Sequence, residues 1–407
     1  MHIDDRSDEI EICAYCPLMC KNVDAFHRHD GTETSAPHIR NLMLQKVLQR
    51  RNKDSEEKVK EHLKSASDIL YKTTLGGENT AWCGNSMDIR ANMLAGRADL
   101  VEHGFEPDGV KRIKKRTCEE HNPYGEDHVD RFAKIDDDII ADVTNRPEAT
   151  IGTWVGCTTA YYQPEIFENL ISVLNTAGIT PKAMTEERCS GLPQYKLGLR
   201  ETAFDLMEYN ANIINDSNVD QLIVDSPECY RAFNEFYPHF GYELETKVIH
   251  SSHFLQELAS SGSIGFDTEL NQKIAYHDSY ELSRHTTPTS RKDHETSDIH
   301  SAPRELIDNI SGVERVELRH NREKAFSCGA DLGVQEMYSD IGRDVARTVL
   351  NEIERAGAKK VVVGSPACKQ HLSDVIRKDN LNFTVVSLPE IVAQANSALH
   401  QRSNRPS

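Results

Sequence analysis

A repeated stretch in the second half of the chain constrains the fold more than any other feature. Residues 222–229 (LIVDSPEC) and 361–368 (VVVGSPAC) each run from an apolar segment into Ser-Pro-x-Cys, and a helical pattern follows both. Another cysteine turn stands 40 residues before each, at Cys189 (RCSG) and Cys328 (SCG). Two landmarks at matching separation predict two copies of one α/β unit, over residues 150–265 and 266–407.

Short apolar runs alternate with helical patterns throughout both copies. The runs lie at 153–156, 221–224, 273–276, 360–363 and 384–387, and the helical stretches include 164–177, 201–210, 334–356 and 390–400. This alternation predicts α/β layers with mostly parallel sheets. Because ligands of open α/β sheets sit at the carboxyl ends of strands, we expect the cysteines of both copies at that edge.

The first part of the chain has a different texture. Residues 1–110 contain three stretches with helical periodicity, at 36–50, 55–71 and 87–103, and we expect a small helical domain there. Residues 111–149 are polar and charged, with Pro123 and Gly125, and are expected to be a connector. The expected fold class is therefore α+β overall, with a small helical domain followed by two repeated α/β units.

Charge and composition exclude several classes of function. The 65 acidic and 47 basic residues give a net charge of −18, which disfavours nucleic acid and anionic membranes as partners. No stretch approaches the roughly 18 apolar residues of a membrane-spanning helix, and the acidic start lacks an export pattern. We expect a cytoplasmic protein, held at a membrane only through a partner if at all.

Ten cysteines in a chain of this size, with no export pattern, favour metal or redox use over structural disulfides. Three of them, Cys13, Cys16 and Cys20, lie within eight residues, so their thiolates can converge on one metal centre. Cys118 lies outside every motif and is expected to be incidental. The sequence has no glycine-rich nucleotide fingerprint after a strand, so we expect no flavin or NAD on this chain.

With these motifs the chain resembles the iron–sulfur subunits that have a ferredoxin-like front and two cysteine-rich CCG domains. These are relatives of heterodisulfide reductase subunits and of the iron–sulfur subunits of glycerol-3-phosphate, glycolate and lactate dehydrogenases. The resemblance covers nearly the whole chain and rests on Cys157, on the turns at Cys189 and Cys328, and on the Ser-Pro-x-Cys segments. It implies that residues 1–110 form a ferredoxin-like domain.

The front domain departs from the two-cluster ferredoxin pattern in an ordered way. That pattern is Cys-x2-Cys-x2-Cys-x3-Cys given twice, and the fourth cysteine of each run ligates the other cluster. The first run here is Cys13, Cys16, Cys20 and then Asp24, and the second aligns as Thr73, Gly76, Asn79 and Cys83. One cluster thus keeps all four ligands and the other keeps none. The resemblance implies one [4Fe–4S] cluster on Cys13, Cys16, Cys20 and Cys83, with a four-thiolate zinc site as the alternative.

Both CCG motifs are incomplete. A full set of five cysteines can hold a non-cubane [4Fe–4S] cluster that acts on a disulfide. The first unit keeps Cys157, Cys189 and Cys229, with Ser190 and Ser226 at the other two positions, so a second iron–sulfur centre there stays open. The second unit keeps only Cys328 and Cys368, with Tyr280, Ser327 and Ser365 replacing cysteine, which makes a cluster there still less expected. A redox pair or a partial metal site is the alternative role for these two thiols.

The expected function is that of an iron–sulfur electron-transfer subunit without a catalytic residue of its own. Its partner would be a flavoprotein dehydrogenase acting on a small organic substrate, with a further electron acceptor as a second partner. Two alternatives stay open: a thiol/disulfide catalytic subunit like heterodisulfide reductase, and a structural scaffold with a vestigial CCG pair. His277 and Asp278 end a strand at the site edge, where they either donate hydrogen bonds or shape the turn.

Overall fold

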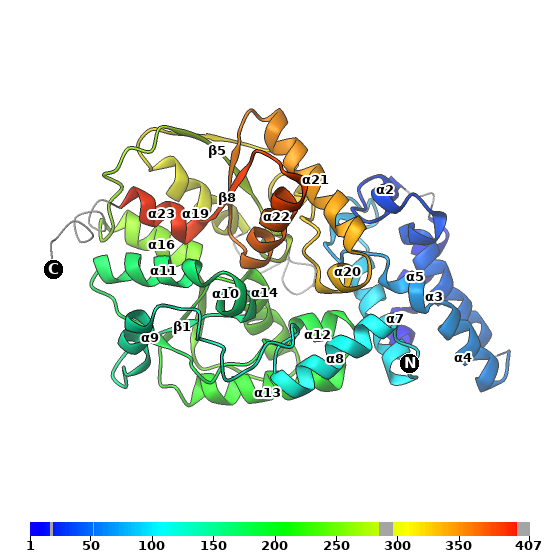
Figure 1. Cartoon of the computed structure of the whole chain (residues 1–407). Helices are drawn as coiled ribbons and strands as arrows, with labels where there is room; N and C mark the ends of the chain where they lie inside the picture. The colour runs from blue at the N-terminus through cyan, green and yellow to red at the C-terminus, as the bar shows by residue number, and fades with distance from the viewer. Residues whose placement is uncertain (17–18, 52, 285–295, 397–407) are drawn as a thin grey trace.

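The computed structural model describes residues 1–16, 19–51, 53–284 and 296–396. A helical N-terminal domain, blue in Figure 1, lies at one side of the molecule. Beside it are two α/β units, one mainly green and the other yellow to red. Each unit contains a four-stranded, all-parallel sheet. The α+β fold class with repeated parallel units is therefore confirmed.

Before residue 151 the described part of the chain contains helices and turns but no strand. The stretches expected to be helical at 36–50, 55–71 and 87–103 correspond to α3, to α4 with α5, and to α7. The elements are η1 (His2–Arg6), α1 (Ser7–Ala14), η2 (Met19–Asn22), α2 (His27–Asp30), η3 (Glu33–Ser35), α3 (Pro37–Arg51), α4 (Glu56–Ser65), α5 (Ser67–Tyr71), α6 (Glu78–Ala81), α7 (Ile89–Glu102), α8 (Asp108–Glu120) and α9 (Asp137–Thr144). The last two lie largely within the segment expected to be a connector, and they bury Val110, Ile113 and Val143 against the rest of the molecule.

The two units share one topology. The first has the strand order β2-β1-β3-β4 and the second β6-β5-β7-β8. The first unit consists of β1 (Ile151–Trp154), α10 (Cys157–Tyr162), α11 (Pro164–Thr176), β2 (Lys182–Ala183), α12 (Leu192–Lys196), α13 (Arg200–Asn215), β3 (Gln221–Val224), α14 (Pro227–Arg231), the π-helical turn η4 (Ala232–Phe236), α15 (Tyr237–His239), β4 (Lys247–His250) and α16 (Ser251–Ser260). The second consists of β5 (Gln272–His277), α17 (Tyr280–Ser283), α19 (Thr296–Asp308), β6 (Val313–Val316), η5 (Arg322–Lys324), α20 (Leu332–Met337), α21 (Ser339–Arg355), β7 (Lys360–Val363), α22 (Pro366–Asp379), β8 (Thr384–Ser387) and α23 (Leu388–Ala395).

The repeated Ser-Pro-x-Cys motif forms the same strand-to-helix turn in both units. The serine hydroxyl accepts a hydrogen bond from the cysteine amide, at 3.4 Å for Ser226 and Cys229 and at 3.3 Å for Ser365 and Cys368. Serine is a favoured residue at this capping position, and proline suits the first helical turn because its missing N–H has no partner there anyway. The motif therefore places each cysteine in the first turn of a helix, at the carboxyl edge of its sheet.

The two units pack together through two helix pairs that are related by a pseudo-twofold axis. Helix α11 of the first unit packs on α23 of the second, and α16 of the first packs on α19 of the second. Since α11 and α19 are equivalent in the two copies, as are α16 and α23, the two contacts are related by the repeat. Buried apolar residues of both sheets and of these helices form one continuous core, including Ile223, Ile249, Ile274 and Val362.

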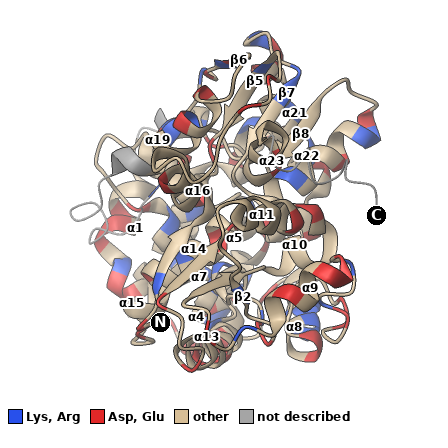
Figure 2. Cartoon of the chain, turned by 90° about the vertical axis from the view of Figure 1, so that its left-hand side faces the viewer, with Lys and Arg blue, Asp and Glu red and all other residues tan. Residues whose placement is uncertain are grey.

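Positions of basic and acidic residues are interspersed along the helices in Figure 2. In the part of the chain that the structure describes, no helix combines the length and the hydropathy needed to cross a membrane.

Candidate functional site

The four front cysteines come together in one pocket. Cys13 lies in the last turn of α1, Cys20 lies in η2, and Cys83 follows α6. With Cys16 they line a single hollow, whose other walls are Ile12, His38, Asn85, Met87 and Ile89. Cys13 is buried and the other three are partly exposed. The sequence-predicted ligand set is thus assembled from two distant segments.

The chemistry of this donor set fits a group that binds thiolates. Burial raises the pKa of the Cys13 thiol to about 12, and the charges of Cys20, Cys16 and Cys83 act in the same direction. Burial, followed by the charge of Asp24, raises the pKa of Cys20 to about 11. The thiolate forms of Cys13 and Cys20 are therefore disfavoured here without a cation beside them, and a coordinating metal centre supplies that charge.

Sulfur spacing separates a cluster from a single zinc ion. A tetrahedral zinc with Zn–S bonds of about 2.3 Å holds its sulfurs about 3.8 Å apart. Among the described residues, the groups of three or more metal-binding side chains whose ligand atoms lie within 4.8 Å of one another do not include these cysteines. No three of the four sulfurs therefore lie within 4.8 Å of one another in the described part of the chain.

Two of the four residues that the ferredoxin-like alignment assigns to a second cluster belong to a buried polar network. Asn79 Nδ2 donates to Asp24 Oδ2 at 2.7 Å, and Arg40 forms a buried ion pair with the same carboxylate. A Cβ atom at Gly76 would lie 2.5 Å from Glu78 Oε2, so a side chain at this position requires Glu78 to move. Thr73, at the remaining position, is buried.

The same network connects the front domain to the second α/β unit. Glu78 Oε1 accepts a hydrogen bond from the Ser327 amide at 2.7 Å, and Arg284 donates to the Gly76 carbonyl. Burial raises the pKa of Glu78, and the nearby Arg284 charge opposes that rise. Hydrogen bonds from the segment around Gly76 and Glu78 therefore join the front domain to the second cysteine turn.

The first unit brings its three cysteines together with the two serines that replace cysteine. A hydrogen bond with Cys189 lowers the pKa of Cys157 to about 7. Burial opposes this shift, and the charge of Arg131 assists it. Burial raises the pKa of Cys229 to about 12, and hydrogen bonds from Ser226 and Ser190 oppose that rise. The hydroxyls of Ser226 and Ser190 thus bond to the Cys229 sulfur, at positions where a full CCG motif has two further cysteines.

A buried arginine that the sequence motifs do not mark occupies the edge of this group. Arg131 Nη1 lies 3.6 Å from Cys157 Sγ, and the same guanidinium forms a buried ion pair with Glu187 at 2.5 Å. Glu187 also accepts hydrogen bonds from the amides of Val155 and Gly156, at 2.9 and 2.7 Å. Arg131 comes from the polar segment before the sheet, where no local pattern singles it out. It supplies the positive charge that stabilises a Cys157 thiolate.

In the second unit the remaining cysteines are in direct contact. Cys328 Sγ and Cys368 Sγ lie 2.7 Å apart, and both side chains are buried. Tyr280, at the position of the lost first cysteine, bonds through its hydroxyl to Lys196 Nζ at 3.0 Å. Lys196 is buried among the carboxylates of Glu228, Glu281 and Asp331, so Tyr280 belongs to an ionic network that joins the two units.

The glycine of each cysteine turn is required by its backbone. Gly191 and Gly329 have φ values of +84° and +83°. A Cβ atom would lie 2.8 Å from the Ala203 carbonyl oxygen in the first case and 2.5 Å from that of Gly342 in the second. The Cys-Gly turn therefore packs against the long helix of its own unit in both copies, α13 and α21.

This shared geometry agrees with the comparison to known families. The sequence model of the cysteine-rich CCG domain matches residues 151–234 and 275–373. The two α/β units are CCG domains. Each match contains one cysteine turn and one Ser-Pro-x-Cys motif, so the resemblance inferred from the cysteine pattern is confirmed.

Relatives extend the likeness beyond the CCG domains. One subunit of the dihydromethanophenazine:CoB–CoM heterodisulfide reductase of Methanosarcina barkeri is 26% identical over 95% of this chain and 94% of its own length. The probable iron–sulfur-binding oxidoreductase FadF of Bacillus subtilis is 29% identical over 54% of this chain and 30% of its own. The EtfAB:quinone oxidoreductase of Syntrophomonas wolfei is 27% identical over 61% and 33%. A hypothetical protein from Helicobacter pylori shares the fold, with a TM-score of 0.54 at 11% identity over 97% of this chain and 76% of its own.

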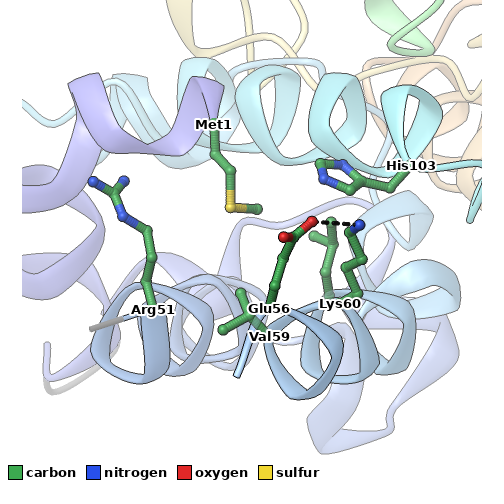
Figure 3. A pocket seen from close by; sticks show the side chains of 7 residues that line it. Met1, Arg51, Glu56, Val59, Lys60 and His103 are labelled. Atoms are coloured by element: carbon green, nitrogen blue, oxygen red, sulfur yellow. Dashed lines mark ion pairs between the residues drawn. The ribbon is translucent and has the colours of Figure 1, made fainter. Parts of the chain in front are cut away.

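A second hollow, shown in Figure 3, lies in the front domain away from the thiols. It is formed between α4, the start of the chain and the end of α7, and its lining is Met1, Arg51, Glu56, Val59, Lys60, Leu63 and His103. Glu56 and Lys60, one turn apart on α4, form an ion pair at 2.6 Å beside it. It contains no cysteine and does not join the thiol site.

Proposed function

We propose that this chain is an iron–sulfur electron-transfer subunit with one [4Fe–4S] cluster on Cys13, Cys16, Cys20 and Cys83. When bound, such a cluster accepts and releases single electrons. The protein holds the four thiolates in place and sets the burial and the charges around them. The observation that carries the proposal is the pocket lined by all four cysteines, drawn from two segments.

The filled position of the other ferredoxin cluster supports a single cluster in the front domain. Asp24 and Asn79 have replaced two of its ligands and bond to each other, and Arg40 balances the buried carboxylate. Neither residue is a thiolate, the ligand that iron–sulfur clusters take from proteins, and the Asp24 charge is already paired. The front domain then exchanges electrons through one centre rather than along a chain of two.

An exposed apolar face adjoins the proposed cluster. Among the described residues, the exposed large apolar side chains are Ile12, Tyr15, Trp82 and Val129, and the first three each neighbour a cluster cysteine in sequence. Exposed aromatic residues are enriched where proteins dock. We assign this face to the flavoprotein dehydrogenase that exchanges electrons with the cluster, in line with relatives that are oxidoreductases or subunits of them.

The disulfide reaction named for heterodisulfide reductase is not carried over to this chain. The first CCG domain holds an arginine against Cys157, and the second keeps two cysteines of five. A role as scaffold alone makes a different prediction, because it needs no reducible cluster.

An anaerobic redox titration followed by electron paramagnetic resonance tests the proposal. We expect one cluster that takes up one electron reversibly, at a potential between about −700 and +450 mV. A cluster that no reductant in this range reduces would support the scaffold role. Two magnetically interacting clusters would contradict the proposal.

A further inference from the structure

Three buried side chains of the second CCG domain form a compact group that the proposed function does not use. His277 ends β5, Cys328 lies in the turn before α20, and Cys368 lies in the first turn of α22. Their ligand atoms all lie within 4.8 Å of one another, and all three residues are buried. The group contains one imidazole nitrogen and two sulfurs.

The strand register of the second unit places His277 in this group. Trp154 of β1 pairs with Val224 of β3, and His277 of β5 pairs with Val363 of β7, so Trp154 and His277 hold equivalent positions. Trp154 packs edge-on against Phe233, with ring centroids 4.8 Å apart. The second CCG domain has therefore exchanged a core aromatic residue for a buried imidazole beside two thiols. Such an exchange is unfavourable unless the polar ring has a strong partner.

The two sulfurs are those of free cysteines in close contact. The 2.7 Å separation of Cys328 Sγ and Cys368 Sγ is longer than the disulfide bond of about 2.05 Å, so the structure holds no bond between them. A disulfide would satisfy the sulfurs but leave the imidazole without a role. A metal ion uses all three ligands.

We propose that His277, Cys328 and Cys368 bind a single thiophilic divalent cation, with zinc as the expected ion. Two thiolates and one divalent cation sum to zero, which suits a fully buried site. Binding draws the sulfurs apart to about 3.8 Å, the spacing that tetrahedral zinc sets. The three protein ligands leave the fourth position to water or a small exogenous ligand. This inference does not depend on the proposed electron-transfer function.

The surroundings explain why the ion is not an iron–sulfur cluster. The oxygens at the three lost cysteine positions are engaged elsewhere: Ser365 accepts from the Cys368 amide, Ser327 accepts from the Gly329 amide at 3.1 Å, and Tyr280 bonds to Lys196. The network around Glu78 fills the position through which a second ferredoxin cluster would have connected this site to the front. A redox-inactive ion fits a site without an electron relay.

Metal analysis of the full-length chain, purified anaerobically with its front cluster, tests the proposal. We expect about one zinc per chain beside the iron. Cys328→Ser and His277→Asn should each lower the zinc affinity at least about tenfold, since even the loss of a residue that only contacts a zinc ligand costs that much. Cys118→Ser and His250→Gln serve as controls, because they alter an exposed cysteine and another buried strand-end histidine. Iron content and the far-ultraviolet circular dichroism spectrum verify that each variant folds.

Cobalt substitution of the unaltered protein gives a second readout. Co²⁺ bound by two thiolates should show a thiolate-to-cobalt charge-transfer band that disappears in Cys368→Ser. Zinc content that stays unchanged in both Cys328→Ser and His277→Asn would overturn the proposal. A metal-free protein in which mass spectrometry finds a Cys328–Cys368 disulfide would overturn it as well.

Discussion

Asn79 Nδ2 donates a hydrogen bond to Asp24 Oδ2 at 2.7 Å, and both residues stand where a two-cluster ferredoxin has cysteine ligands of the same cluster. They are far apart in sequence but adjacent in space, as two ligands of one cluster must be. The hydrogen bond joins the two segments directly. Together with the Arg40 ion pair, this hydrogen bond gives Asp24 a structural role in the front domain.

Asp24→Asn should destabilise the front domain while leaving the iron content unchanged. The substitution keeps the shape of the side chain but leaves the Arg40 guanidinium buried without its counter-charge, which costs about 3–5 kcal/mol. The urea midpoint of unfolding, measured anaerobically, should fall accordingly. Asp138→Asn changes an exposed carboxylate and should stay within about 0.5 kcal/mol of the unaltered protein. A loss of iron with unchanged stability would show that Asp24 acts on the cluster instead.

Local sequence was sufficient to predict the repeat and its turns. Ser226 and Ser365 cap helices because serine, proline and cysteine stand close together in the chain, and the apolar runs before them form the central strands. Three strands, β2, β4 and β6, were not predicted. Strand β2 has only two residues and so carries little periodic signal, and the pairing of all three is set by neighbours in the sheet.

Replacing Cys157, Cys189 and Cys229 together by serine should leave the iron content at about four per chain, the content of one cubane cluster. Arg131 and the two serines already satisfy these sulfurs, so no iron is lost with them. Inductively coupled plasma mass spectrometry of the anaerobically purified triple variant provides the measurement. A drop in iron would mean that the first CCG domain holds a centre of its own.

Contacts that depend on distant segments could not be predicted from the sequence. Arg131 reaches Cys157 from a polar stretch with no motif, and only the fold brings them to 3.6 Å. His277 was visible at the end of a strand, but its position beside Cys328 and Cys368 follows from the pairing of β5 with β7. The ligand set proposed for the front domain came from the ferredoxin-like resemblance, and the structure brings its four cysteines to one pocket.

His250→Gln should weaken the dependence of stability on pH below neutrality. Burial lowers the pKa of His250 to about 3. Its Nδ1 accepts a hydrogen bond from the Ser252 amide at 3.2 Å, and its Nε2 lies 3.1 Å from the Asp225 carbonyl oxygen, so the folded protein holds the neutral ring. The unfolded chain binds a proton below about pH 6.5 and the folded one does not, so stability falls as the pH drops.

From about pH 6.5 to about pH 5 this histidine should remove about 2 kcal/mol from the free energy of unfolding, at about 1.4 kcal/mol per pH unit. Asp225, whose pKa burial raises to about 6, contributes a slope of opposite sign that is present in both proteins. Urea unfolding at several pH values measures this effect. As the pH falls, the free energy of unfolding should decrease less in the His250→Gln variant than in the unaltered protein. Parallel curves would contradict the assignment of a neutral buried imidazole.

Iron and sulfide analysis of Cys83→Ala is the most direct test of the central claim, that one cluster is held by Cys13, Cys16, Cys20 and Cys83. The unaltered chain, purified anaerobically, should contain about four irons and four sulfides and show one cluster signal after reduction. Cys83→Ala should lose this cluster or leave it degraded, although Cys83 is far from the other three in sequence. Cys118→Ala, which removes an exposed cysteine, should retain it in full. Unchanged iron and an unchanged spectrum in Cys83→Ala would contradict the account.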